Sequence, residues 1–433
     1  PQKLVNLGTF IIVLLFLRLF MKAILLASGL SSRMYPLSDK NLLSLAGKPL
    51  LLNIAENAQK GGVSDFIIVA SQDNHVAIKA ICGAHPVLQH CVVEVQEGHG
   101  QDRGVLSGLK HLGDDEPVLV LCGNDYVAPT AYAQIIAATY KYDGALLAKT
   151  VESYFPGGYL SINDEDMIES IIEKPGEGHE PSDVINIVVH GFARSGDLRP
   201  ALEKASSSHD DVYEVGLQKL FETKKFKAVR YTDYWQAVKY PWHVLDLMKL
   251  IIKDQRPSLK NKNFGEVVSG VFVHKTAKVA PSAIFQGKNI IIEAGAKVFH
   301  NAVISGPCYI GKNCIVGNNA LVRGSMLEEG SSAGYNTEIA RSYLGPATTT
   351  HIAYVGDSVV DSGCNFGAFS CTANLRLDHQ AVKVTIKKER TNSGREKLGA
   401  LVGKNAQIGI HSCLMPGVTV HPESFVAPGE VHR

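Results

Sequence analysis

The segment 26–49 combines small residues with fixed positive charges at a spacing that suits a phosphate ligand. It reads Leu-Ala-Ser-Gly-Leu-Ser-Ser-Arg-Met from Leu26 to Met34 and ends in Gly-Lys-Pro. Backbone N–H groups can approach phosphate oxygens only where side chains are small. Arg33 and Lys40 could then neutralise charge on a triphosphate and on its leaving pyrophosphate. From the residues alone, a tight strand-to-helix turn with two surface cations is the alternative, since the spacing is not that of a P-loop.

A second polar segment, residues 351–383, contains a histidine that could act as a base. It begins His-Ile-Ala-Tyr-Val-Gly-Asp-Ser at His351, continues through Asn-Phe-Gly-Ala and Ala-Asn-Leu-Arg, and reaches Lys383. A histidine titrates near neutral pH and can accept a proton from an attacking nucleophile. Taken singly, one of sixteen histidines is more often an ordinary surface or core residue.

Length and composition restrict the class of protein. A chain of 433 residues can form two or three domains with real cores. Its 43 basic and 42 acidic residues are balanced, so charge gives no support for a nucleic-acid partner. The eight cysteines include no Cys-x-x-Cys pair, which favours a reducing compartment and a cytoplasmic location.

The first twenty residues are unusually apolar. Thr9 to Phe20 is interrupted only by Arg18, and it is shorter than the about twenty residues that cross a bilayer. No small-residue cleavage site follows it, as a signal peptide would require. We interpret residues 1–20 as a leader, non-native or disordered, before a start at Met21, so no membrane partner is expected. A membrane anchor is the minority alternative.

Residues 21–245 alternate between short apolar runs and helix-like stretches. This order predicts an α/β domain of Rossmann-like type, with a mostly parallel sheet and ligands at the carboxyl ends of its strands. Trp242–Lys253 has the pattern of an amphipathic helix, and Arg256–Asn263 is the best linker, so we assign 246–265 to helix and linker. The expected strands are 23–26, 66–70, 91–95, 117–121 and 145–150, and the expected helices are 50–59 and 104–112.

Beyond the linker, apolar residues recur every six positions. Neither a helix nor a single strand has this period, whereas a hexapeptide β-helix has one inward residue in each six-residue face. Residues 266–433 are therefore predicted to form a parallel β-helix. The three registers are Val298, Ile304, Ile310, Val316 and Val322; Val402, Ile408, Leu414, Val420 and Val426; and Val273, Val279, Phe285 and Ile291.

The segment 26–49 resembles the signature of sugar-1-phosphate nucleotidyltransferases. The resemblance implies that Arg33 and Lys40 are catalytic and that residues from Leu26 to Gly29 bind the nucleotide. Gln96 to Gln101 resembles the part of that pattern that reads the nucleobase, and Glu-Lys-Pro after Glu173 resembles its sugar-contacting part. The residues so implied are Leu26, Ala27, Ser28, Gly29, Gln96 and Gly100 for the nucleotide, and Gly158, Glu173 and Asn186 for the sugar phosphate.

The resemblance also implies Mg²⁺, held by carboxylates. The family's Gly-Asp appears here as Gly-Asn-Asp, so Asp125 is one place late as the metal ligand, or Asn124 takes its place. A second departure is Ala237, which stands where related enzymes have Asp. An alanine cannot bind a cation. Both departures bear on metal binding and therefore on the rate of nucleotidyl transfer.

The C-terminal part resembles the acetyltransferase half of the bifunctional glucosamine-1-phosphate N-acetyltransferase and N-acetylglucosamine-1-phosphate uridyltransferase family, in its archaeal-type branch. The resemblance implies a left-handed β-helix that assembles as a homotrimer, with His351 as general base and Asn374 orienting it or binding sugar. Ala340 replaces an expected lysine, with Arg341 beside it. The other implied residues are Arg323, Tyr354, Asn365 and Lys383 for the sugar phosphate, and Ala368 and Ala427 for acetyl-CoA.

Together these patterns predict a two-site transferase of amino-sugar activation. The β-helix would acetylate glucosamine-1-phosphate from acetyl-CoA. The first domain would then couple the product to UTP, or dTTP, with release of pyrophosphate. One alternative keeps a single activity, either an acetyltransferase with weak nucleotidyl transfer or a glucose-1-phosphate uridylyl- or thymidylyltransferase. Another is a non-catalytic regulatory scaffold, which would have no need of Arg33, Lys40, Glu173 and His351.

Overall fold

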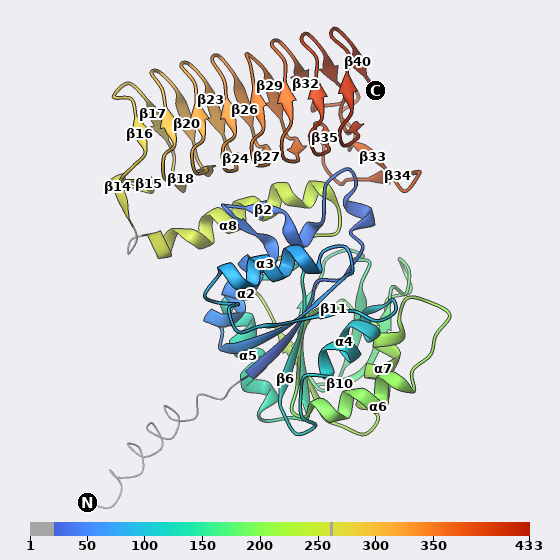
Figure 1. Ribbon diagram of the computed structural model, residues 1–433. Coiled ribbons are helices and arrows are strands. Elements are labelled where there is room, and N and C mark those ends of the chain that lie inside the picture. Colours follow the sequence, from blue (N-terminus) through green and yellow to red (C-terminus); the bar gives the residue numbers. More distant parts are fainter. Residues whose placement is uncertain (1–20, 260–262) are drawn as a thin grey trace, which may run out of the picture. The chain divides into compact units, whose positions relative to one another are not determined.

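The computed structural model describes residues 21–259 and 263–433, with side-chain detail outside 256–262. The predicted leader, residues 1–20, lies outside the described part. The chain divides into two compact units (Figure 1). The first unit contains Ile54–Asp233 and the chain up to Gly29. The second contains Leu30–Asn53 and Tyr234–Arg433, so the segment that carries Arg33 and Lys40 belongs to the same unit as the C-terminal strands.

The first unit is built on four parallel strands in the order β6-β1-β4-β5. These are β1 (Met21–Leu26), β4 (Val63–Ala70), β5 (Val92–Val95) and β6 (Val118–Cys122). Each coincides with an expected strand. The continuous apolar runs of β1, β4 and β6 reflect burial on both faces of the sheet, whereas β5 at the edge is partly exposed. The predicted parallel core of this α/β domain is confirmed.

Antiparallel strands extend this sheet beyond β6. The long strand β11 (Val184–Phe192) runs antiparallel to β6 and also pairs with β8 (Gly144–Thr150) and β9 (Gly158–Ile162). Outside them lie β10 (Ile168–Glu173), antiparallel to β9, and β12 (Phe226–Arg230), parallel to β8. The register pairs Glu173 with Gly158, which brings two expected sugar-contacting residues side by side.

Helices pack closely against this sheet. On one side α4 (Gln101–Leu109), α6 (Leu198–Glu203) and α7 (Val212–Phe221) share a buried cluster with the strands. Gly108 allows the close approach of α4, because a Cβ there would meet Ile24 Cγ2 at 2.6 Å. The remaining helices are α2 (Leu50–Lys60), α3 (His75–Ala84), α5 (Pro129–Thr139) and the short η3 (Ser195–Asp197), and β7 (Asp125–Val127) follows β6 after a two-residue turn.

The C-terminal part of the second unit is a parallel β-helix whose coils stack into three sheets (Figure 1). Its inward residues form one continuous buried cluster, and they include every residue of the first two predicted registers. The three sheets contain, in order, β15, β18, β21, β24, β27, β30, β35 and β38; β16, β19, β22, β25, β28, β31, β36 and β39; and β17, β20, β23, β26, β29, β32, β37 and β40.

The first of these sheets also carries an antiparallel strand, β14 (Phe264–Val268), at its edge. Its parallel strands are β15 (Val271–His274), β18 (Ile290–Ile292), β21 (Cys308–Ile310), β24 (Met326–Leu327), β27 (Tyr343–Leu344), β30 (Val359–Val360), β35 (Leu401–Val402) and β38 (Thr419–Val420). The second sheet contains Lys278–Val279, Lys297–Val298, Ile315–Val316, Ser332–Ala333, Thr349–Thr350, Asn365–Phe366, Gln407–Ile408 and Phe425–Val426. The third contains Ile284–Gln286, Val303–Ser305, Leu321–Arg323, Glu338–Ala340, Tyr354–Gly356, Cys371–Thr372, Cys413–Leu414 and Val431–His432.

The third predicted register is wrong at its last member. Val273 pairs with Ile292, nineteen positions on, so the six-residue count slips by one in this coil. Ile290 and Ile292 join the interior cluster, and the alternation of a strand turns Ile291 to the outer face of the sheet. Ile291 is nevertheless fully buried, in register with Phe272 and Tyr309.

Two other parts of the second unit pack with this β-helix. The helix α8 (Val244–Leu259) follows η4 (Pro241–His243), and it continues through part of the predicted linker. The segment Leu30–Asn53 contains η1 (Ser32–Met34), η2 (Lys40–Leu42) and the hairpin of β2 (Ser44–Leu45) with β3 (Lys48–Pro49). The strand β13 (Trp235–Ala237) precedes η4, and the hairpin of β33 (Lys383–Ile386) with β34 (Glu389–Asn392) projects from one coil.

None of the helices in the described ranges has both the length and the apolar character that crossing a membrane requires.

The inward position predicts a stability difference between two isoleucines. Ile310 is fully buried inside the β-helix, whereas Ile315, five residues later, points outward and is 39% exposed. Ile310→Ala should lower the free energy of unfolding by about 2–5 kcal/mol, because it leaves a cavity in a closed shaft. Ile315→Ala should change it by about 0.5 kcal/mol or less. Denaturant unfolding of both variants measures this, and equal losses would contradict the assigned inward and outward faces.

Candidate functional sites

The first part of the phosphate-binding segment follows β1 directly, with its backbone fixed by neighbouring elements. The Ala27 N–H donates to the Val69 carbonyl at 2.8 Å, and Asn74 Nδ2 donates to the Ala27 carbonyl at 2.9 Å. The Gly123 N–H donates to the Leu26 carbonyl at 2.9 Å. The loop therefore starts at the carboxyl end of a central parallel strand, the usual ligand position in such sheets.

Ser28, Gln96 and Gly100 are brought together as neighbours. Ser28 Oγ donates to Gln96 Oε1, and Gln96 Nε2 donates to the carbonyls of Gly98 and Gly100 at 3.2 and 2.9 Å. The amide oxygen is thus held by the loop that follows β1, and the amide nitrogen is held by the loop of Gln96 itself. Gly100 has a φ of 104°, a conformation that favours glycine.

Gln101 adds a polar atom at a residue that was not among the predicted site residues. It begins α4, and its Nε2 is buried with no hydrogen-bond partner among the described residues. A buried donor without a partner is uncommon and is satisfied when a ligand oxygen reaches it. Its position directly after Gly100 in the Gln96–Gln101 motif was the signal that could have identified it.

Arg33 and Lys40 lie in the second unit. The Arg33 guanidinium carbon is 5.8 Å from the ring centroid of Tyr240, which stacks on Trp242 at 4.6 Å. The Lys40 N–H donates to Ser31 Oγ at 3.3 Å at the start of η2. Neither cation forms an ion pair with a residue in 21–259 or 263–433, so both charges are available to an anionic ligand.

Gly158, Glu173 and Asn186 converge in the first unit. A Cβ placed on Gly158 would lie 2.7 Å from Asn186 Nδ2 and 3.2 Å from Glu173 Oε2. The Glu173 carboxylate also pairs with Lys174 Nζ at 2.7 Å. The missing side chain of Gly158 therefore leaves room beside one amide and one carboxylate, a suitable combination for sugar hydroxyls.

A buried histidine holds the Asn186 amide in place. His190 Nε2 lies 3.0 Å from Asn186 Oδ1, and His190 Nδ1 lies 2.9 Å from the Tyr213 hydroxyl. Because an amide oxygen only accepts, Nε2 must carry the proton, and Nδ1 accepts from Tyr213. Complete burial lowers the pKa of His190 to about 3, so the ring stays neutral. The sequence offered no motif for His190.

A buried carboxyl group lies close to the same residues. Desolvation, with a smaller contribution from the charge of Glu173, raises the pKa of Glu214 to about 8. Glu214 lies on α7 and is buried. At neutral pH it is held mainly in its protonated form, so it does not add a second full negative charge beside Glu173.

Asp125 is the candidate metal ligand. It is buried at the start of β7, and the neighbouring Asn124 Oδ1 accepts a hydrogen bond from the Cys122 thiol. No group of three or more histidines, cysteines or carboxylates that could hold a metal ion occurs in the described ranges. Mg²⁺ needs only one or two carboxylates when phosphates and waters complete its shell, so Asp125 fits a minimal site of that kind. Ala237 is 4% exposed and supplies no ligand.

On the β-helix, Tyr354 and Asn374 belong to one charged cluster. Asn374 Nδ2 donates to Asp357 Oδ2 at 2.5 Å and to the Tyr354 hydroxyl at 3.2 Å. Arg341 donates to the same carboxylate from Nε and Nη2, at 2.6 and 2.5 Å. Asp357 is buried and was not among the predicted residues, although it lies inside the motif that begins at His351. Arg341, noted beside Ala340, is thereby oriented.

No hydrogen bond to this cluster is formed by the other predicted residues of the β-helix within the described ranges. Arg323 pairs with Glu338 at 2.7 Å, and Asn365 Oδ1 accepts from Thr349 Oγ1 at 2.9 Å. His351 is exposed at the corner after β28, one coil before Asn374, and its ring forms no hydrogen bond with any described residue. Ala368 and Ala427 lie at the same corner two coils apart, and Lys383 is exposed on β33.

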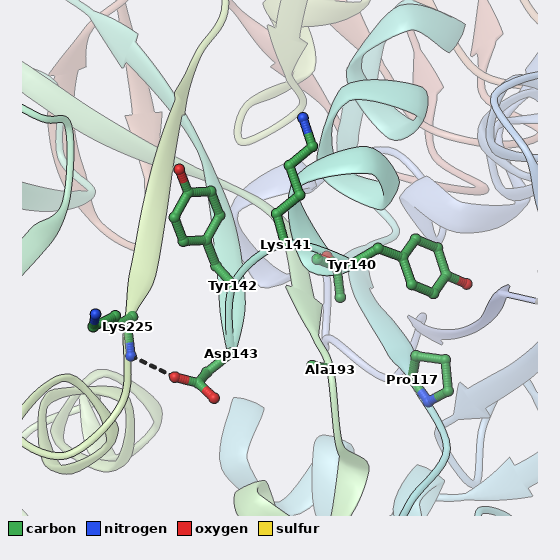
Figure 2. Close-up of a pocket in the computed structure, with 8 residues that line it drawn as sticks. Pro117, Tyr140, Lys141, Tyr142, Asp143, Ala193 and Lys225 are labelled. Carbon is green, nitrogen blue, oxygen red and sulfur yellow. Dashed lines mark hydrogen bonds between the residues drawn. The ribbon is translucent and has the colours of Figure 1, made fainter. Parts of the chain in front are cut away.

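A pocket of about 480 Å³ lies at the opposite edge of the first unit's sheet (Figure 2). Pro117 precedes β6 and Ala193 follows β11, so the pocket opens at the amino ends of the parallel strands. In it Asp143 Oδ2 accepts from the Lys225 N–H at 2.8 Å. None of the predicted site residues lines this pocket, so we do not assign it to the reaction.

Comparison with known proteins agrees with both halves of the chain. Residues 22–238 match the nucleotidyl transferase family, and residues 289–324 match the bacterial transferase hexapeptide family. The fold and the two polar sites thus define a nucleotidyl transferase joined to a hexapeptide-repeat transferase, with a left-handed β-helix as its second part.

Relatives that align with almost the whole chain define the family more closely. The bifunctional protein GlmU of Methanococcus maripaludis is 30% identical over 94% of this chain and 93% of its own length, and that of Methanocaldococcus jannaschii has the same identity and coverage. A bifunctional sugar-1-phosphate nucleotidylyltransferase/acetyltransferase of Sulfurisphaera tokodaii is 28% identical over 95% of this chain and 97% of its own. The chain belongs to the family of bifunctional GlmU proteins.

The neutral state of His190 predicts how stability depends on pH. Its folded-state pKa is depressed, so its stabilising effect is present above the unfolded value of 6.5 and is lost as pH falls toward 3. Below pH 6.5 the parent should lose about 1.4 kcal/mol of unfolding free energy per pH unit relative to His190→Gln, which cannot ionise.

Denaturant unfolding of both proteins between pH 7.5 and 5 measures this difference. His209→Gln is the control, because His209 is exposed and is likewise replaced by an uncharged residue. Parallel pH curves for the parent and His190→Gln would contradict the buried neutral histidine.

Proposed function

We propose that the chain acetylates glucosamine-1-phosphate on its β-helix and couples the product to UTP in its first domain. In this proposal the nucleotidyltransferase domain spans residues 21–245 and the acetyltransferase domain spans residues 266–433. The observation that carries it is the presence in one chain of two separate polar sites of different chemistry. One places Glu173 and Asn186 around Gly158, and the other joins Asn374 to Asp357, with His351 one coil before Asn374. Family membership supports both activities.

For nucleotidyl transfer, a phosphate oxygen of N-acetylglucosamine-1-phosphate attacks the α-phosphorus of UTP in line with the leaving pyrophosphate. One P–O bond forms and one breaks, so the protein's contribution is positioning and charge stabilisation. The small-residue loop 26–29 offers backbone N–H groups, and Arg33 and Lys40 neutralise the phosphates. Gly158, Glu173 and Asn186 hold the sugar, and Gln96 and Gly100 face the base.

The residues fit a magnesium ion held by Asp125. A bound ion would supply positive charge that stabilises the phosphates and the leaving pyrophosphate. Because Ala237 stands at the second expected ligand position, Asp125 is the one acidic side chain at the expected positions that could bind the ion. This observation favours, as a second candidate, a working acetyltransferase with slow nucleotidyl transfer.

For acetyl transfer, His351 takes a proton from the amine of glucosamine-1-phosphate as the amine attacks the thioester carbonyl of acetyl-CoA. An amide bond forms, the C–S bond breaks and CoA leaves. Arg323, Tyr354, Asn365 and Lys383 contact the sugar phosphate, with Asn374 fixed through Asp357. Ala368 and Ala427 line the path of CoA.

His351 and Asn374 form no direct bond, which fits a site completed by a second copy of the chain. We therefore retain the homotrimer, formed through the β-helix, as part of the proposal. All eight cysteines are free thiols, which supports the expected cytoplasmic compartment.

Removing the Lys40 charge tests the nucleotidyltransferase assignment. Lys40→Ala should lower the rate of pyrophosphate release from UTP and N-acetylglucosamine-1-phosphate by about 100-fold, because the variant loses a cation that stabilises the leaving group. Its acetyl transfer should not change. The control is Lys60→Ala at the exposed end of α2. An unaltered rate of pyrophosphate release in Lys40→Ala would refute the role.

Removing the His351 ring tests the acetyltransferase assignment. His351→Ala should slow CoA release from acetyl-CoA and glucosamine-1-phosphate by about 100- to 10,000-fold. Nucleotidyl transfer from supplied N-acetylglucosamine-1-phosphate should stay at the parent rate. His274→Ala, in the first coil, serves as control. CoA release at the parent rate in His351→Ala would exclude this base.

A further inference from the structure

One corner of the β-helix alternates between glycine and a polar side chain along its length. From β18 onward, the residues that follow the strands of the first sheet are Glu293, Gly311, Glu328, Gly345, Asp361, Gly403 and then His421. All seven occupy the same place in successive coils. Each of the first six donates its N–H to the last strand residue of the next coil, as Glu328 does to Leu344.

The glycines are required by close approach between coils. A Cβ on Gly345 would lie 2.7 Å from the Asp361 carbonyl carbon, and one on Gly311 would lie 2.7 Å from the Leu327 carbonyl oxygen. The polar side chains are therefore separated by two coils, about 10 Å, with no side chain between them. This spacing forms a row of discrete attachment points.

Glu328 is the most deeply buried of these residues, and every contact of its carboxylate is with the hairpin β2–β3. Its oxygens accept from the Ala46 N–H at 2.6 Å, the Gly47 N–H at 2.9 Å and the Ser44 hydroxyl at 2.7 Å. Glu328 is 0% exposed. Ala46 and Gly47 both have positive φ, 54° and 76°, so their adjacent N–H groups can converge on one anion.

Two tyrosines of the first β-helix sheet also contact the β2–β3 hairpin. The Tyr343 hydroxyl donates to the Ser44 carbonyl at 2.7 Å. A Cβ on Gly47 would lie 2.9 Å from the Tyr309 hydroxyl, so the glycine of Gly-Lys-Pro is needed for contact with the β-helix. The hairpin is therefore held by a carboxylate and by the outer face of β21 and β27.

The next two polar residues of the row hold the same segment nearer to Arg33. Asp361 Oδ2 accepts from both the N–H and the hydroxyl of Ser38, at 2.8 and 2.7 Å. His421 Nδ1 lies 2.5 Å from the Tyr35 hydroxyl, with the two rings 5.6 Å apart. Three consecutive attachment points of the β-helix thus hold positions 35, 38 and 44–47.

We propose that Glu328, Asp361 and His421 are positioning residues for nucleotidyl transfer, which act by fixing the segment that presents Arg33 and Lys40. This rests on the proposed function of that segment. The attachment points enclose Lys40, which lies between Ser38 and Ser44, and the first of them, Tyr35, follows Arg33 by two residues. The β-helix then serves the nucleotidyltransferase reaction as well as its own.

Burial raises the pKa of Glu328 to about 7, and its two carboxylate oxygens accept all three hydrogen bonds from the hairpin, whereas an amide has only one acceptor oxygen. A carboxylate that accepts several hydrogen bonds holds its partners more strongly and with a more defined geometry than an amide does. Displacing a catalytic group by about 1 Å can cost about 100-fold in rate. An amide side chain at position 328 should therefore loosen the hairpin without removing any group that touches the nucleotide.

The test compares two reactions of the same full-length protein. In Glu328→Gln, kcat/KM for pyrophosphate release from UTP should fall about 10- to 100-fold, while CoA release stays within about twofold of the parent. Hydrogen exchange of the 44–47 amides should become faster. Glu329→Gln is the matched control, because this neighbour is exposed and pairs only with Lys312 at 3.3 Å. If the parent protein is active and Glu328→Gln has an unchanged kcat/KM for pyrophosphate release, the proposal is wrong.

A second variant covers the case in which Glu328→Gln does not fold. Ser38 is exposed, and Ser38→Ala removes one of its two hydrogen bonds to Asp361. We therefore expect kcat/KM for pyrophosphate release to fall by about threefold to tenfold, with no change in acetyl transfer. Asp361→Asn combined with Ser38→Ala should lose less than the sum of the single changes. Equal losses in both reactions would show general destabilisation and refute positioning. If the parent itself releases no pyrophosphate, the proposed function fails instead.

Discussion

The structure of the second unit depends on the stacking of β-helix coils in strict register. One inward apolar residue in every six closes the shaft, and parallel backbone pairing places equivalent residues of successive coils one above another. As a result, polar residues that are far apart in the sequence lie close together in the fold. Arg341, Asp357 and Asn374 meet because they occupy equivalent or adjacent positions in neighbouring coils. The same constraint turns one corner into a row of polar side chains separated by glycines, and this row holds the segment 35–47.

The first unit obtains its site by a different route. Parallel strands bring their carboxyl ends to one edge, and there Ala27 is tied to Val69 and Asn74 before the chain leaves the unit. The residues proposed to contact the sugar come instead from the antiparallel extension of the sheet, where Glu173 and Gly158 are in register and Asn186 lies beside them. His190 and Tyr213 support the Asn186 amide from the buried side, because a neutral imidazole can donate with one nitrogen and accept with the other.

Most of the fold could be predicted from the sequence because it rests on periodicity. Apolar runs identified the parallel strands, and the six-residue repeat identified the β-helix, except at Ile291, where a nineteen-residue coil shifted the register. The supporting residues could not be predicted. Glu328 carries no motif, and its three donors lie more than 280 positions away. His190 and Asp357 likewise derive their meaning from partners that only the folded chain brings near. Sequence reasoning found residues that resemble a known pattern, and the structure showed which residues hold them.

The central claim is that one chain performs two consecutive transfers on the same sugar phosphate. Mass spectrometry of the products tests this most directly, in a mixture of the protein with glucosamine-1-phosphate, UTP and Mg²⁺, with and without acetyl-CoA. We expect UDP-N-acetylglucosamine, CoA and pyrophosphate in the complete mixture. Without acetyl-CoA, we expect no acetylated product until N-acetylglucosamine-1-phosphate is supplied. A complete mixture that yields neither acetylated sugar phosphate nor UDP-linked product would contradict the claim.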